Sequence, residues 1–172
     1  VFLCVGRVAV EKNLEAFLDL DLPGTKLVVG DGPARMALER KYPAAVFLGA
    51  RHGEELAEIY AAADIFVFPS KTDTFGLVLL EALASGLPVA AFPVNGPRDV
   101  IGSAPGGVLN DDLHKACIQA LQIPRDICVE FATAHTWQAS ARVFVEHAQN
   151  IGSTEPEGDA VEFVAEDPHF AA

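Results

Sequence analysis

Basic residues are scarce in this chain, and their scarcity argues against a nucleic-acid partner. The 172 residues contain 12 Lys and Arg against 24 Asp and Glu, a formal net charge of −12. Proteins that bind duplex nucleic acid neutralise its phosphates with clustered cations, and a strongly acidic chain repels them. We therefore expect no nucleic acid among the partners of this protein.

Cysteines and long apolar runs are also scarce. Only Cys4, Cys117 and Cys128 are present, with no C-x-x-C spacing. This odd count fits neither a disulfide framework nor a zinc site and indicates a reducing compartment. The longest uncharged run, at 82–97, has 16 residues and is interrupted by Gly86, Pro88 and Pro93, so it cannot span a bilayer as a helix. The N-terminal residues do not resemble a signal peptide, so we expect a cytoplasmic location.

The acidic charge is concentrated at the C-terminus. Residues 151–172 hold six acids and no Lys or Arg, which is half of the net charge. This segment shows no clear periodicity, and we interpret it as an acidic tail. Residues 1–150 then form one domain of ordinary size. Because the chain opens directly on a strand pattern, we expect it to be a piece of a longer protein.

Short apolar runs alternate with helical patterns along the chain. Strands are expected at residues 1–6, 26–30, 45–50, 65–70, 87–93 and 106–110. Helices are expected at residues 11–20, 34–42, 54–63 and 75–85, with a short helical turn at 96–102 and mostly helix over 111–150. This alternation predicts an α/β fold, a three-layer Rossmann-like parallel sheet with helices on both faces.

Ligands of such sheets bind beyond the carboxyl ends of the strands. A dinucleotide site would show G-x-G-x-x-G after the first strand, whereas this turn reads GRVAVEK, and the P-loop pattern is also absent. Instead, Arg7 and Lys12 flank the turn between the first strand and the first helix. Two cations near a helix N-terminus suit a phosphate group, although they are equally expected as solvated surface charges.

Residues 70–89 contain the most informative segment. Gly76 precedes a helical pattern, and Asp73 and Glu81 bracket it with seven residues between them. Glu81 is the only charge in the apolar stretch 75–90, so we expect it to be buried with a partner. That partner is either a hydroxyl-rich ligand or a Lys or Arg. Asp73 alone would more simply be a helix N-cap.

We expect no metal site. The D-x-D pattern at Asp19 and Asp21 ends a predicted helix instead of following a strand, and the five histidines show no ligand spacing. Asp31 is expected to be a turn residue, with Pro33 starting the next helix.

Several segments together resemble one known family. They are GRVAVEKN (6–13), VVGDGP (28–33), FLG (47–49), ADIFVFPS (63–70), TDTFGLVLLEALASGLPVAA (72–91) and GPRDVIG (96–102). In this order they resemble the C-terminal, donor-binding half of a retaining glycosyltransferase of GT-B architecture, in the family called glycosyl transferases group 1. The resemblance implies that an N-terminal, acceptor-binding domain lies outside this chain.

The resemblance also implies residue roles. Arg7 and Lys12 would hold the diphosphate of the donor, Glu81 would bind the ribose hydroxyls, and Asp73 would lie near the donor sugar. Asp73 stands where the family has Glu, and Thr74 where Gly is common, which bears on sugar identity. The implied catalytic residues are Arg7, Lys12, Asp73 and Glu81. The implied donor-binding residues are Gly6, Arg7, Lys12, Gly49, Ala50, Arg51, Thr74, Phe75, Gly76, Leu77 and Glu81.

The implied activity is metal-independent transfer of a sugar from a nucleoside diphosphate sugar to an acceptor hydroxyl, without a cofactor. A UDP-linked donor is expected before a GDP-linked one. Residues 72–91 resemble bacterial glycolipid synthases, which favours a glycolipid acceptor, or a polysaccharide precursor, and peripheral association of the full enzyme with the inner face of the membrane. The alternatives are a sugar-nucleotide epimerase of GT-B type, which would need no acceptor, and a non-catalytic nucleotide-binding module.

Overall fold

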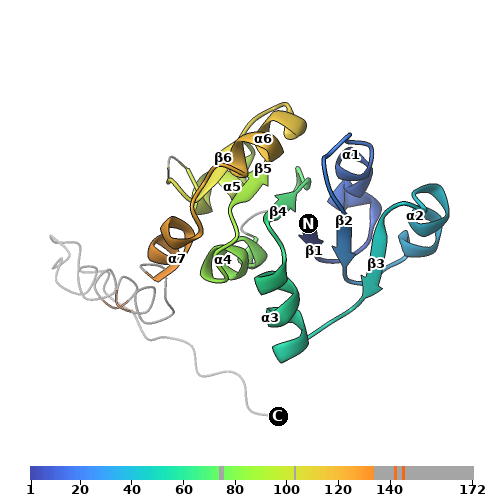
Figure 1. Ribbon diagram of the computed structural model, residues 1–172, viewed down its shortest axis with the longest axis horizontal. Coiled ribbons are helices and arrows are strands. Elements are labelled where there is room, and N and C mark those ends of the chain that lie inside the picture. The colour runs from blue at the N-terminus through green and yellow to red at the C-terminus, as the bar shows by residue number, and fades with distance from the viewer. Residues whose placement is uncertain (74–75, 103, 134–141, 143–144, 146–172) are drawn as a thin grey trace, which may run out of the picture. The chain divides into compact units, whose positions relative to one another are not determined.

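The computed structural model describes residues 1–73, 76–102 and 104–133, together with 142 and 145 (Figure 1). Every helix and strand below lies in the unit Val1–Thr136. The expected acidic tail at 151–172 and most of residues 134–150 lie outside the described residues.

Six parallel strands form one sheet, as the sequence predicted. They are β1 (Phe2–Val5), β2 (Lys26–Val29), β3 (Val46–Gly49), β4 (Ile65–Phe68), β5 (Val89–Ala91) and β6 (Gly107–Leu109). Their order is β3-β2-β1-β4-β5-β6, and each neighbouring pair is parallel. From β1 to β3, each new strand is added on one side of β1; from β4 to β6, each new strand is added on the opposite side. The direction therefore reverses between β1 and β4, the place where sheets of this type bind ligands.

The helices follow the predicted alternation, with one clear exception. They are a 3-10 helix (Val10–Lys12), α1 (Leu14–Leu18), α2 (Arg35–Lys41), α3 (Gly53–Ala62), α4 (Leu77–Ala84), α5 (Asn95–Val100), α6 (Leu113–Ala120) and α7 (Arg125–Thr133). The single helix expected over 11–20 is wrong, because Asn13 adopts a left-handed conformation with φ of 53° between the 3-10 helix and α1. Asn tolerates this conformation better than most residues. Pro33 also precedes α2 instead of starting it.

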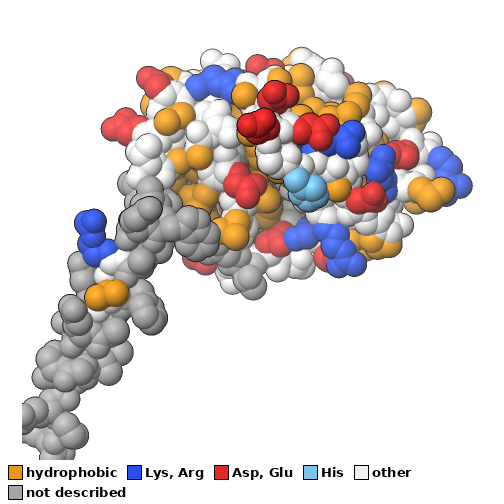
Figure 2. Space-filling model, turned by 90° about the horizontal axis from the view of Figure 1, so that it is seen from below, with side chains coloured by type: hydrophobic (Ala, Val, Ile, Leu, Met, Phe, Trp, Pro, Cys, Tyr) orange, Lys and Arg blue, Asp and Glu red, His pale blue; other side chains and the backbone are white. Residues whose placement is uncertain are grey.

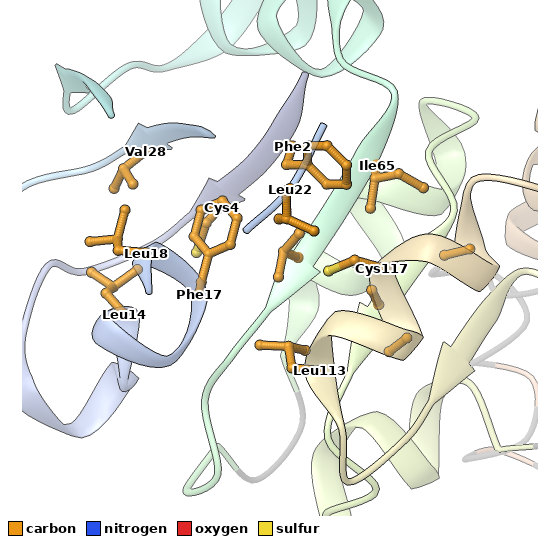
Figure 3. Packing of buried hydrophobic residues seen from close by; sticks show 14 of the residues in the cluster. Phe2, Cys4, Leu14, Phe17, Leu18, Leu22, Val28, Ile65, Leu113 and Cys117 are labelled. Atoms are coloured by element: carbon orange, nitrogen blue, oxygen red, sulfur yellow. The ribbon is translucent and has the colours of Figure 1, made fainter. Parts of the chain in front are cut away.

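The two faces of the sheet bury separate hydrophobic clusters. Side chains alternate along each strand, so Phe2 and Cys4 point to one face while Leu3 points to the other. Helices α1, α2 and α6 contribute to the first cluster, part of which Figure 3 shows between Phe17 and Cys117. Helices α3, α4, α5 and α7 contribute to the second. The predicted three-layer arrangement is therefore confirmed (Figure 1).

The turn after β2 packs directly against the turn after β1. The Val8 amide donates to the Asp31 carbonyl at 2.9 Å, and the Gly6 amide donates to the Val29 carbonyl at 2.9 Å. At Gly30, where φ is +137°, an added Cβ would lie 1.8 Å from the Gly6 carbonyl oxygen. Only glycine allows this approach, so the VVGDGP segment supports the turn that carries Arg7.

We expect Gly30→Ala to destabilise the fold markedly. The overlap with the Gly6 backbone should lower the free energy of unfolding by roughly 1–3 kcal/mol beyond the strain of a positive φ. Gly53→Ala is the matched control, since φ is +57° there and an added Cβ would meet no atom within 4 Å. Urea unfolding of both variants measures the difference, and equal losses would contradict the proposed contact.

The described surface carries mixed charges. On the face in Figure 2, acidic and basic side chains are interspersed, and no continuous basic area is visible among the coloured residues. Cys4, Cys117 and Cys128 are all buried and free of disulfides. None of the described helices has the length and apolar character needed to cross a bilayer.

Candidate functional site

Two loops meet at the reversal point of the sheet. Residues 6–13 follow β1, and residues 69–76 follow β4, of which 74–75 are outside the description. The Asn13 side-chain amide donates to the Pro69 carbonyl at 3.0 Å, and the Thr72 hydroxyl donates to the Glu11 carbonyl at 3.3 Å. We call these two segments the switch-point loops. Their contacts hold the first predicted site segment against the second.

Lys12 and Asp73 form the central contact of the switch-point loops. The Lys12 ammonium donates to Asp73 Oδ1, and the two side chains are only 29% and 21% exposed. Asp73 Oδ2 is buried and accepts no hydrogen bond from any described residue. The predicted phosphate-binding cation and the predicted sugar-binding carboxylate thus lie together. The N-cap alternative for Asp73 is wrong, because Gly76 occupies that position with φ of 80°.

The environment of Asp73 favours its charged form. Burial raises the pKa of the carboxyl, but the Lys12 hydrogen bond, the nearby Ser70 hydroxyl and the Lys12 charge outweigh it, and the pKa is lowered from 3.8. A lowered pKa in the folded state stabilises the fold above the ordinary Asp pKa. That stabilisation disappears as the pH falls below this value toward the folded-state pKa.

We therefore expect acid to destabilise the wild type more than Asp73→Asn. Between about pH 5.5 and about pH 3, the wild type should lose the contribution of the ion pair, which the amide variant lacks throughout. Urea unfolding at several pH values measures this difference, with the exposed Asp99→Asn as the control. Parallel pH profiles for wild type and Asp73→Asn would show that the pair contributes no stability.

Arg7 lies in the same loop but is not part of this contact. Its side chain is 65% exposed, and Arg7 Nη1 lies 3.2 Å from Glu11 Oε1. Among the described residues, the ion pair of Arg7 is with Glu11 and not with Asp73. Arg7 is therefore a solvent-facing cation of the first switch-point loop. An incoming anion could bind it by replacing Glu11, since an exposed ion pair is weak.

The expectation that Glu81 is buried is wrong. The core-facing side chains of α4 are Leu79, Ala82 and Leu83, and helical spacing places Glu81 on the exposed side. Its partner is neither Lys nor Arg among the described residues. Instead, the Tyr60 hydroxyl donates to Glu81 Oε2 at 3.0 Å. Glu81 thus presents an accessible carboxylate at the second turn of α4.

The remaining predicted residues occupy separate places. Gly49 ends β3, an edge strand two positions from β1, and Arg51 pairs with Glu55 at 2.9 Å. Within the described segments, the hydrogen bonds and ion pair of Arg51 are local, to Ala50 and Glu55, and do not reach the switch-point loops. Leu77 begins α4 and is 51% exposed. Ala50 also follows β3, Gly6 follows β1, and Thr74 and Phe75 lie outside the described residues.

Sequence reasoning missed three contributors. Asn13 joins the two loops, and Glu11 pairs with Arg7. An asparagine inside the helix predicted over 11–20 was an available signal for a break. Tyr60 lies within the helix predicted over 54–63 and was given no role in the site. Its bond to Glu81 joins positions 21 apart in sequence, and no local pattern reveals such a contact.

Metal ligation has no candidate in the described part of the chain, where no group of three or more His, Cys, Asp or Glu side chains converges. The D-x-D pattern is engaged elsewhere, since Asp19 caps the end of α1 and accepts a hydrogen bond from the Tyr42 hydroxyl at 2.7 Å. Asp31 lies between β2 and α2, just before the turn at residues 33–34, and it accepts a hydrogen bond from the Gly32 amide at 2.7 Å.

Comparison with known proteins decides the family. Residues 1–123 match the family described as Glycosyl transferases group 1. The chain belongs to this family. The match covers all six strands and the whole set of predicted site residues, so the glycosyltransferase family expected from the sequence is confirmed.

Relatives within the glycosyltransferases cover the same region. A GDP-mannose-dependent alpha-mannosyltransferase of Mycobacterium tuberculosis is 48% identical over 107 residues, which are 61% of this chain and 28% of that protein. A sulfoquinovosyl transferase of Arabidopsis thaliana is 45% identical over 102 residues, 56% of this chain and 20% of that protein. The chain therefore spans about a quarter of the length of these curated relatives.

A solved structure shares the fold. The crystal structure of Anabaena HepE in complex with UDP superposes with a TM-score of 0.61 at 21% sequence identity. The match covers 88% of this chain and 48% of the other. The fold of this chain therefore also occurs as part of a larger protein.

Proposed function

We propose that this chain is the donor-binding part of a retaining, metal-independent glycosyltransferase. The whole enzyme would move a sugar from a nucleoside diphosphate sugar to an acceptor hydroxyl of a glycolipid or polysaccharide precursor. The acceptor would be held by a part of the enzyme outside this chain. Membership of the family and the placement of the candidate residues support this proposal.

The Lys12–Asp73 contact carries the proposal. It lies where the order of the sheet reverses, next to the loop that leads into Gly76 and the N-terminus of α4. When the glycosidic bond breaks, negative charge develops on the β-phosphate oxygens. A lysine ammonium and the positive end of a helix stabilise such charge without a metal.

The Asp73 carboxylate gives the second part of the site. Its side chain is 21% exposed, so a hydroxyl group of a ligand can reach the carboxylate, although Oδ2 is its buried oxygen. A sugar attached to a diphosphate bound at Lys12 would bring hydroxyl groups to this carboxylate. We propose that Asp73 orients the donor sugar in this way and that Arg7 assists Lys12 at the diphosphate.

The nucleoside would extend from the diphosphate along α4. Glu81 lies on the exposed side of that helix, where its carboxylate is open to the ribose hydroxyls. The base would rest near Gly49, Ala50 and Arg51. The family resemblance favours UDP over GDP, and the structure of Anabaena HepE is a complex with UDP. The mycobacterial relative is named as GDP-mannose-dependent. Both nucleotides therefore belong in the first test.

Titration calorimetry with UDP, GDP and ADP at millimolar concentration tests this proposal. We expect one diphosphate to bind this chain, and at ~100 times its dissociation constant it should add about 2.7 kcal/mol to the stability. For a domain of this size the melting temperature should rise by roughly 6–10 °C. No heat and no melting shift with any of them would refute the donor site. Turnover of a nucleotide sugar without an acceptor would favour the epimerase.

A further inference from the structure

Tyr60 connects the core of the domain to the exposed carboxylate of Glu81. It lies in α3, its side chain is 3% exposed, and its ring packs against Phe66 of β4 with centroids 5.9 Å apart. Its hydroxyl reaches Glu81 Oε2 at 3.0 Å. A ring held by the core thus fixes one oxygen of a side chain that otherwise lies at the surface.

The direction of this hydrogen bond is settled by chemistry. A carboxylate only accepts, and a protonated phenol donates. Burial, then the Glu81 charge and the hydrogen bond to Glu81, raise the pKa of Tyr60, so its hydroxyl remains protonated. Glu81 Oε2 is therefore occupied. Within the described part of the chain, Oε1 accepts no hydrogen bond that would compete with a ligand.

We propose that Tyr60 is a positioning residue of the donor site, which holds the Glu81 carboxylate so that its free oxygen faces a ribose hydroxyl. This inference rests on the proposed function, in which Glu81 meets the ribose. A glutamate on a helix surface loses rotamer freedom when it binds a ligand. The bond from Tyr60 removes part of that freedom before the ligand arrives and so strengthens binding.

The test compares a ribonucleotide with its 2′,3′-dideoxy counterpart. The ribonucleotide is whichever of UDP and GDP binds the wild type. In Tyr60→Phe we expect its affinity to fall roughly five- to tenfold, the effect of one hydrogen bond, while the dideoxy affinity stays unchanged. In a Glu81→Ala background the same substitution should have no further effect on either ligand.

Tyr42→Phe is the matched control. Tyr42 is the only other tyrosine, and it also donates to a carboxylate, Asp19, at 2.7 Å. It lies at the end of α2 and outside the candidate site, so its substitution should leave the ratio of the two affinities unchanged. Equal losses for both nucleotides in Tyr60→Phe would overturn the positioning role and indicate a merely structural one. A wild type that binds neither nucleotide would instead refute the proposed function.

A second measurement applies to the folded wild type. With tyrosine labelled at ¹³Cζ, the chain gives two signals, and Tyr42→Phe assigns them. We expect the Tyr60 signal to move when the ribonucleotide binds and to move much less with the dideoxy nucleotide, while the Tyr42 signal stays fixed. A Tyr60 signal that is indifferent to bound ribonucleotide would overturn the proposal, whatever the stability of Tyr60→Phe.

Discussion

Lys12→Ala should weaken the binding of a nucleoside diphosphate far more than that of the matching nucleoside. Hydrogen bonds to charged groups contribute roughly 1.5–3 kcal/mol, so we expect the affinity for UDP or GDP to fall by about 10- to 150-fold. The nucleoside lacks the phosphates and should bind about equally to both proteins. Calorimetric titration with UDP and uridine, or GDP and guanosine, measures the two losses.

Arg7→Ala should act in the same direction with a smaller effect. Arg7 is 65% exposed, whereas Lys12 is 29% exposed, and water screens exposed charges more strongly. Lys41→Ala serves as the control for both variants. It also removes a cation from an ion pair, with Glu15 at 2.9 Å, but it lies at the end of α2. Parallel losses for nucleoside and diphosphate would show that Lys12 and Arg7 do not meet phosphate.

Glu81→Ala should weaken nucleoside diphosphate binding much more than Asp73→Ala does. The ribose is present in every donor, so the loss of Glu81 affects UDP, GDP and the nucleosides alike. Removal of Asp73 takes away a contact to the sugar and also frees Lys12 from its ion pair. Asp73→Ala should therefore act mainly on the affinity for the nucleotide sugar.

The exposure of Glu81 makes this comparison informative. Glu81→Ala removes no core packing but leaves the buried Tyr60 hydroxyl without its acceptor, so we expect a loss of stability of about 1–3 kcal/mol, which urea unfolding separates from the loss of affinity. Glu58→Ala is the control, since Glu58 is an exposed glutamate of the neighbouring helix α3. Small and equal losses of affinity in Glu81→Ala and Asp73→Ala would show that the two carboxylates do not divide the roles of ribose and sugar contact.

The sheet was predictable from the sequence because its signals are local. Apolar runs such as 65–68 are buried on both faces, and their separation by helical patterns leaves only a parallel arrangement. The break at Asn13 was not predicted, although an asparagine in a helical pattern is a local signal for one. The apolar spacing over residues 11–20 favours a single helix, and the bond from Asn13 to the Pro69 carbonyl, 56 positions away in sequence, cannot be read from that spacing.

The candidate site was predictable to a similar extent. The strand pattern predicted that Arg7 and Lys12 follow one strand and Asp73 another, and the structure has them after β1 and β4. It did not indicate that Lys12 and Asp73 form an ion pair, because the order β1-β4 is known only once the sheet is assembled. Composition also misled at Glu81, since an apolar neighbourhood in sequence suggested burial although the carboxylate faces solvent.

Amide NMR with a nucleoside diphosphate tests the location of the donor site most directly. In a ¹⁵N-labelled chain titrated with UDP and then GDP, we predict that the largest shift changes fall on Arg7, Lys12 and Asp73 and on the first turns of α4. The amides of α6 and α7 serve as internal references, because these helices pack beside β5 and α4 and carry none of the predicted residues. Changes confined to α6 or α7, or none anywhere at millimolar nucleotide, would contradict a donor site at the switch-point loops.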